Sequence, residues 1–261
     1  MSYLDTILAH KKLEVQQLRR RFSRKSFDSF ELMSRKPLSL SPALEVKRPS
    51  IIAEIKKASP SRGLIRSDYD PAVIATQYQS AGAAAVSVLT DEKFFLGSLD
   101  HLRIARTHLA IPILRKDFII DALQLAEAKA HGADAVLLII AALAREQLRE
   151  LQQEAASLGL ECLIEVHDPH ELDALDWPST RILGVNNRNL KTFQVDVKTT
   201  EDILPLVPEN VLVVSESGLG EPATMRQLHE KGVDAFLIGE AFMSAAHPGE
   251  ALQTVLEALH Q

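Results

Sequence analysis

Eight short apolar runs recur along the chain, separated in part by segments with helical periodicity. The runs begin near Ile51, Ala84, Ile111, Asp134, Leu160, Arg181, Val211 and Asp234. Consecutive starts are 21 to 33 residues apart, the length of one strand, one helix and two loops. At 81–89, 131–139 and 231–239 a glycine precedes the run where a helix needs a left-handed C-terminal residue. The pattern predicts regular alternation of strands and helices, with helices over 70–80, 121–130, 144–157 and 221–230.

Strands this uniformly apolar suit a parallel sheet that helices cover. Eight strand–helix units in about 210 residues favour a closed (β/α)₈ barrel, the TIM barrel. A doubly wound open sheet is the alternative, and it would more often show a G-x-G-x-x-G turn after its first strand. Here the first strand leads into A-S-P-S-R-G at 58–63, which is not that turn.

Residues 1–50 precede the eight units and predict a helical extension. Apolar residues recur there at helical spacing: Leu4, Ile7, Leu8, Val15 and Leu18. The basic residues among them are most simply a solvated helix face: Lys11, Lys12, Arg19, Arg20, Arg21, Arg24 and Lys25. We expect residues 1–261 to form a single barrel domain, with residues 1–50 as an N-terminal extension packed over the barrel mouth.

Composition limits the classes of function. The net charge of -6 and the pI of about 5.9 argue against binding nucleic acid through its phosphate backbone. No apolar run approaches the roughly 20 residues that span a bilayer, and the N-terminus lacks a secretory-signal pattern. The single cysteine, Cys162, fits a reducing compartment. We expect a cytoplasmic protein without nucleic-acid or membrane partners, monomeric or at most weakly self-associating.

Polar side chains stand at the carboxyl ends of the apolar runs, where a barrel places its catalytic mouth. Glu54 and Lys56 are two residues apart in the first run and therefore share a face with Ile52. Other run ends carry Lys116, Glu165, Asn186, Arg188, Glu216 and Ser217. The sequence shows no comparable collection at the opposite end, so these side chains predict one polar site.

Three cations and three glutamates meet in this set, and their balance bears on the chemistry. Carboxylates would hold the lysines protonated while burial would lower their pKa values, so a lysine could act as a general acid near neutral pH. An anion-binding pocket would need the cations but not the glutamates, which favours proton transfer combined with anion binding. A self-neutralising network of ion pairs at the barrel rim is the structural alternative.

Glycines end the last two runs, where many barrels bind phosphate through loop amides and a short helix. Gly218 and Gly239 would allow backbone N–H groups to approach an oxyanion. Glu240 could donate from its amide while its carboxylate points away. His167 and His170 have a spacing that could suggest zinc, but Asp168-Pro169 between them predicts a helix N-cap, and we expect no metal.

Six segments resemble motifs of the indole-3-glycerol phosphate synthase family. They are E-I-K-K-A-S-P-S-x-G (54–63), S-V-L-T-D-E-K-F-F-x-G-S (87–98), K-D-F-I-I-D (116–121), N-N-R-N-L (186–190), S-E-S-G (215–218) and L-I-G-E-A-F-M (237–243). The resemblance covers essentially the whole chain and implies a (β/α)₈ barrel with an N-terminal helical extension. It also implies a decarboxylating, dehydrating ring closure of 1-(2-carboxyphenylamino)-1-deoxyribulose 5-phosphate in tryptophan biosynthesis, without a metal or redox cofactor.

The resemblance implies roles for individual residues. Lys116 would be the general acid for ring closure, oriented by Glu165, and Glu54 with Lys56 would be the acid–base pair for dehydration. Which lysine protonates which oxygen stays open. Substrate-positioning residues would be Asn186, Arg188, Glu216 and Ser217; phosphate-binding residues would be Ser59, Gly218, Gly239 and Glu240; walls for the aromatic ring would be Phe118, Leu138 and Leu190.

Three alternatives remain. A Schiff-base aldolase could use Lys116 or Lys56 as a nucleophile, and a non-catalytic paralogue could bind a phosphorylated ligand. A phosphoribosylanthranilate isomerase is expected, by resemblance to that family, to use a cysteine–aspartate pair, for which Cys162 is badly placed.

Overall fold

The computed structural model describes residues 2–189 and 192–261, and its strands form a closed parallel barrel. The barrel strands are β1 (Ser50–Ile55), β4 (Ala85–Leu89), β5 (Ile113–Lys116), β6 (Ala135–Ile139), β7 (Glu161–Val166), β8 (Ile182–Asn186), β9 (Leu212–Glu216) and β10 (Ala235–Ile238). Each strand pairs with its neighbours in chain order, and β10 closes the ring by pairing with β1, as in Ser50 with Ala235. The (β/α)₈ prediction is confirmed, and the open-sheet alternative is wrong because the first and last strands are bonded.

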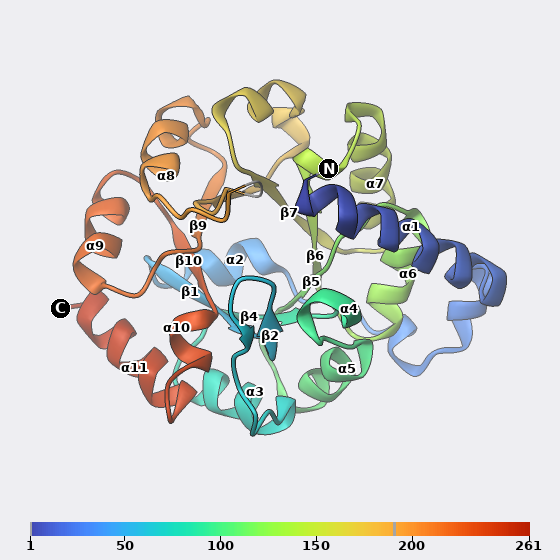
Figure 1. The fold of residues 1–261 in the computed structure, drawn as a ribbon, viewed down its shortest axis with the longest axis horizontal. Coiled ribbons are helices and arrows are strands. Elements are labelled where there is room, and N and C mark those ends of the chain that lie inside the picture. Colours follow the sequence, from blue (N-terminus) through green and yellow to red (C-terminus); the bar gives the residue numbers. More distant parts are fainter. Residues whose placement is uncertain (1, 190–191) are drawn as a thin grey trace.

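Helices surround this ring of strands (Figure 1). The α-helices are α1 (Tyr3–Arg21), α2 (Leu40–Glu45), α3 (Pro71–Ser80), α4 (Glu92–Phe95), α5 (Leu99–His108), α6 (Ala122–Ala130), α7 (Arg145–Ser157), α8 (Lys198–Ile203), α9 (Pro222–Glu230), α10 (Glu240–Met243) and α11 (Pro248–Leu259). The 3₁₀ helices are η1 (Arg24–Ser29), η2 (Glu31–Ser34), η3 (Ile140–Ala142), η4 (Pro169–Ala174), η5 (Trp177–Ser179) and η6 (Leu204–Leu206), and β2 (Ala58–Ser59) pairs with β3 (Gly63–Leu64). In the described part of the chain, no helix combines the length and the apolar character that crossing a bilayer requires.

The local signals of the sequence are confirmed at helix ends. The four predicted helices α3, α6, α7 and α9 each begin one residue later than predicted, because the first residue of each range is the N-cap. The glycines between helix and strand are left-handed as expected, with φ of +95° at Gly82, +96° at Gly132 and +118° at Gly232. Residues with a side chain rarely adopt this conformation, so each glycine lets the chain turn directly into the next strand.

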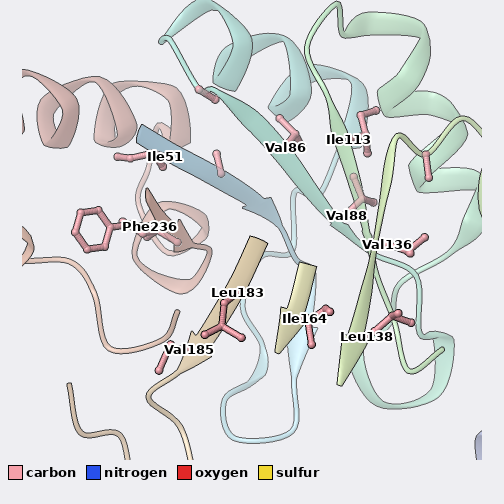
Figure 2. Close-up of a cluster of buried hydrophobic side chains, with 14 of the residues drawn as sticks. Ile51, Val86, Val88, Ile113, Val136, Leu138, Ile164, Leu183, Val185 and Phe236 are labelled. Atoms are coloured by element: carbon pink, nitrogen blue, oxygen red, sulfur yellow. The ribbon is translucent and has the colours of Figure 1, made fainter. Parts of the chain in front are cut away.

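Strand alternation divides the apolar core into two layers. Ile51, Val88 and Ile164 belong to the layer between the barrel and its helices (Figure 2). The neighbouring Ile52 and Leu163 point to the inside of the barrel. Because successive side chains point to opposite faces, one strand fills both layers, and its polar end residues then open into the barrel mouth.

The N-terminal helix α1 lies across one side of the mouth in Figure 1. Its Ile7 is buried and joins the inner apolar layer. The sequence pattern placed Lys11 on a solvated helix face, and this prediction is wrong because the side chain is buried. Its Nζ lies 2.9 Å from Asp91 and 2.8 Å from Asp117, and the side chain is only 3% exposed. Burial alone would lower the pKa of Lys11, but Asp117 and Asp91 raise it above its ordinary value, so a charged pair anchors α1.

The opposite end of the barrel also carries an ionic cluster, which the sequence pattern did not reveal. Asp134, just before β6, is fully buried, and its two oxygens lie 2.7 Å from the guanidinium groups of Arg35 and Arg106. It also accepts hydrogen bonds from the amides of Leu38 and Ile113. Since both oxygens of the carboxylate are satisfied by protein donors, this cluster ties the N-terminal extension to the barrel.

Candidate active site

The carboxyl ends of the strands surround a cavity of about 470 Å³. It is lined by most of the predicted site residues: Glu54, Lys56, Ser59, Lys116, Phe118, Glu165, Asn186, Arg188, Glu216, Ser217, Gly218, Gly239 and Glu240. These come from β1, β5, β7, β8, β9 and β10 and from the segments that follow them, so residues distant in sequence meet at one mouth.

Lys116 stands between two buried carboxylates. Its Nζ donates hydrogen bonds to Glu165 Oε2 at 3.0 Å and to Glu216 Oε2 at 2.8 Å. Burial alone would lower the pKa of Lys116, but the charges of Glu165, Glu216 and Glu54 outweigh it and raise that pKa well above its ordinary value. The sequence argument left the balance between burial and carboxylates open. The geometry decides this balance in favour of the protonated ammonium.

The two glutamates that share Lys116 differ in their own proton affinity. Burial raises the pKa of both carboxyls. At Glu165 the positive charges of Lys116 and His167 prevail, and the pKa falls well below its ordinary value. At Glu216 burial and the negative charge of Glu165 prevail over Lys116, and the pKa rises to about 7. Two carboxyls with pKa values pushed apart are suited to different roles, one as a permanent anion and one as a proton carrier near neutrality.

Glu54 and Lys56 form a second pair, with Lys56 Nζ 2.5 Å from Glu54 Oε1. Glu54 is 2% exposed and lies against Gly239 of the neighbouring strand end. A Cβ atom at residue 239 would collide with the Glu54 carboxyl group, so a glycine is required there for packing. Gly184 makes similar room for Glu216, since a Cβ there would lie 2.5 Å from Glu216 Oε1. Neither packing role is evident from the sequence pattern.

The candidate phosphate end of the cavity departs from the prediction in one respect. The Glu240 carboxylate does not point away; it accepts a hydrogen bond from Arg62 Nε at 2.8 Å and lies 3.9 Å from Arg188. Ser217 and Gly218 both have positive φ, +67° and +73°, which turns the chain sharply after β9. For the non-glycine Ser217 this is an unusual conformation, of the kind that occurs at ligand-binding turns.

The apolar wall of the cavity differs from the predicted one. Phe118 lines it, but Leu138 does not, because Leu138 points outward into the layer under the helices (Figure 2). Its neighbours Leu137 and Ile139 face the cavity instead. Strict alternation along β6 would have given this assignment. Leu190 lies outside the described residues.

Further wall residues come from elements that the sequence argument did not connect with the site. They are Tyr3, Leu4 and Ile7 from α1, Phe95 from α4, and Phe193 and Val195 from the segment after β8. Nothing in the local pattern of these residues shows which end of the barrel they cover.

This fold and this site define a (β/α)₈ barrel with a cavity lined by lysines and glutamates at the carboxyl ends of its strands. A family model described as Indole-3-glycerol phosphate synthase matches residues 4–255, and the chain belongs to that family. Its members are decarboxylating lyases of tryptophan biosynthesis.

Individual relatives agree with this membership. The chain is 50% identical to "Indole-3-glycerol phosphate synthase" of Chlorobium chlorochromatii (strain CaD3) over 92% of this chain and 95% of that protein. It is 53% identical to the protein of the same name from Salinibacter ruber (strain DSM 13855 / M31) over 84% of this chain and 81% of that one. Among solved structures, 3-hexulose-6-phosphate synthase from Salmonella typhimurium superimposes with a TM-score of 0.64 at 13% identity, covering 81% of this chain and 99% of that chain. At that identity the likeness concerns the fold alone.

Proposed function

We propose that the cavity carries out the indole-3-glycerol phosphate synthase reaction by proton transfers between its lysines, its glutamates and the substrate. The observation that carries this proposal is the position of Lys116, held as an ammonium between Glu165 and Glu216 in the wall of the cavity. Ring closure requires a proton for the ketone oxygen of the substrate as the new carbon–carbon bond forms and CO₂ leaves. A charged ammonium beside that oxygen would stabilise the developing alkoxide and supply the proton.

Dehydration needs a second donor and a base. The hydroxyl leaves as water when it receives a proton, and one proton is returned from the intermediate to a carboxylate as the indole becomes aromatic. Lys56 and Glu54, paired at 2.5 Å, are placed to share these two tasks.

The substrate would be oriented by apolar residues around its aromatic ring and by polar residues around its phosphate. Phe118, Leu137 and Ile139 offer apolar surface for the flat aromatic ring. Ser59, Gly218 and Gly239 line the same cavity and would offer backbone amides to the phosphate, while Asn186 and Arg188, which also line it, would bind the polar groups of the substrate. Arg62 and Arg188 around Glu240 add the positive charge that a phosphate needs.

The raised pKa of Lys116 also bears on the aldolase alternative. A Schiff base forms from a neutral amine, and a lysine held protonated by two carboxylates is a poor nucleophile. A non-catalytic paralogue would have no use for the buried carboxylates that surround this lysine. Borohydride treatment in the presence of a sugar phosphate separates the cases, because only an aldolase would be trapped covalently.

The direct test is the fluorescence of the indole product formed from the purified substrate. The wild-type chain should release indole-3-glycerol phosphate, and Lys116→Met should lower kcat by at least about a thousandfold while the circular dichroism spectrum stays unchanged. Lys198→Met, at an exposed lysine that does not line the cavity, is the matched control and should keep full activity. Near-normal turnover by Lys116→Met would refute the proposed role.

A monomeric state and a cytoplasmic location are further proposals. The monomeric state is proposed from the net charge of -6, and the cytoplasmic location is proposed from the single cysteine. Light scattering coupled to size exclusion would test the first, and fractionation of source cells would test the second.

A further inference from the structure

His167 lies directly behind the candidate catalytic carboxylate. It follows β7 two residues after Glu165 and so stands in phase with it. Its Nε2 atom lies 3.1 Å from Glu165 Oε1, while Lys116 binds the other oxygen, Oε2, at 3.0 Å. The His167 side chain is 8% exposed and does not line the cavity. Glu165 therefore lies between a lysine on the cavity side and a histidine on the protein side.

The surroundings of His167 contain few other charges. Its Nδ1 atom lies 3.7 Å from Glu171 of η4, and its backbone amide donates to the same carboxylate at 2.7 Å. The neighbouring strands β6 and β8 and the helix η3 carry no titratable side chain in the described structure. The charged residues of α7 are exposed, apart from Glu154, which pairs with Arg24. Glu165 and Glu171 are thus the charged groups that face the ring.

We infer that His167 is a positioning residue of this site: its cationic ring holds the Glu165 carboxylate in place and ionised, so that the exchangeable proton of the site resides on Glu216. Burial would lower the pKa of His167, but Glu165 and Glu171 raise it to about 9. The imidazolium is then the charged form at neutral pH and adds to the effect of Lys116 on Glu165. Among the residues that the structure describes, Lys116 is the one cation paired with Glu216, and that difference separates the two carboxyls. This inference deepens the proposed function and rests on it.

The test replaces the ring by a neutral amide. His167→Gln should retain the fold and bind substrate with a KM within about threefold of wild type. Its kcat should fall about tenfold, and the acidic limb of its kcat–pH profile should shift to higher pH, because Glu165 loses a neighbouring cation and takes up protons more readily. His170→Gln, three residues away and exposed, is the matched control and should show neither change.

Two outcomes distinguish this inference from the proposed function. A wild-type chain without synthase activity would overturn the proposed function, whereas an active wild type with an unchanged His167→Gln profile would overturn the role of His167 alone. Nitrogen-15 NMR of the histidine rings gives a readout that needs no turnover. The pKa of His167 should lie near 9 in the wild type and fall toward the ordinary value of about 6.5 in Glu165→Gln. An unchanged His167 pKa in that variant would also overturn the inference.

Discussion

Lys11 of the N-terminal helix and Asp117, the residue after Lys116 in the barrel, form a buried ion pair at 2.8 Å. Asp117 is held in turn by Arg115 and by the hydroxyl of Thr90. The helix that walls the cavity is thereby bonded to the strand end that carries the central lysine. A single cation at Lys11 thus connects the extension with the site.

Replacing Lys11 should weaken both the fold and substrate binding. Lys11→Met leaves Asp91 and Asp117 without this cation in a buried place, so the free energy of unfolding should fall by about 3–5 kcal/mol. KM should rise, because α1 carries Tyr3, Leu4 and Ile7 into the cavity wall. Urea unfolding and steady-state kinetics measure the two effects. Lys12→Met, at the exposed neighbour, should leave both unchanged.

The same cluster predicts how stability depends on acid. Burial would raise the pKa of Asp117, but Lys11 and Arg115 hold it well below its ordinary value. A carboxyl with a lowered folded-state pKa stabilises the protein above its unfolded pKa, about 3.9, and loses that contribution as pH falls toward the folded value. The free energy of unfolding should therefore decline below about pH 4. A Lys11→Met variant whose acid slope equals that of wild type would contradict this account.

The pKa of Glu216 predicts that stability depends on pH with the opposite sign, falling as pH rises. Its folded pKa of about 7 exceeds the unfolded value of about 4.3, so the folded state binds the extra proton between them. Stability should fall as pH rises through this window and level off above pH 7. Glu216→Gln removes this titration. Between pH 4.5 and 8, the free energy of unfolding of the variant should therefore fall by about 3 kcal/mol less than that of wild type. Glu209→Gln, at an exposed glutamate, should follow the wild-type curve.

Catalysis should be sensitive to substitution of Gly239, although this residue has no side chain. Gly239→Ala would push its methyl group into the Glu54 carboxyl and displace it from Lys56. We expect kcat to fall about ten- to a hundredfold, with a smaller change in KM. Gly220→Ala is the matched control, since its Cβ would meet Ala241 at an ordinary 3.7 Å. Equal kcat values for the two variants would show that the position of the Glu54 carboxyl group does not depend on a glycine at residue 239.

Adjacent leucines on β6 offer a paired test of the apolar wall. Leu137→Ala should raise KM, because Leu137 faces the cavity. Leu138→Ala should instead lower the free energy of unfolding by about 2–5 kcal/mol and leave KM near the wild-type value, because Leu138 packs under the helices. A KM effect confined to Leu138→Ala would reverse the assignment made from strand alternation.

Much of the architecture is contained in local signals. Glycine at residues 82, 132 and 232, capping aspartates such as Asp70, and apolar strand segments depend on backbone geometry within a few residues. Strand alternation likewise placed Glu54 and Lys56 on one face, and both line the cavity. These features follow from sequence because each arises from neighbouring residues.

The chain by itself thus determined the barrel, the set of polar strand ends and the family to which the resemblance pointed. Only the tertiary structure decided which charges touch: that Lys116 binds Glu216 as well as Glu165, that His167 stands behind Glu165, and that Lys11 is buried. It also decided that Glu240 turns toward Arg62, whereas strict alternation along β6 would already have assigned Leu137 rather than Leu138 to the cavity. The physical reason is that contacts and pKa values depend on distance and burial in the folded chain, mostly between residues tens to hundreds of positions apart, and periodicity does not encode these.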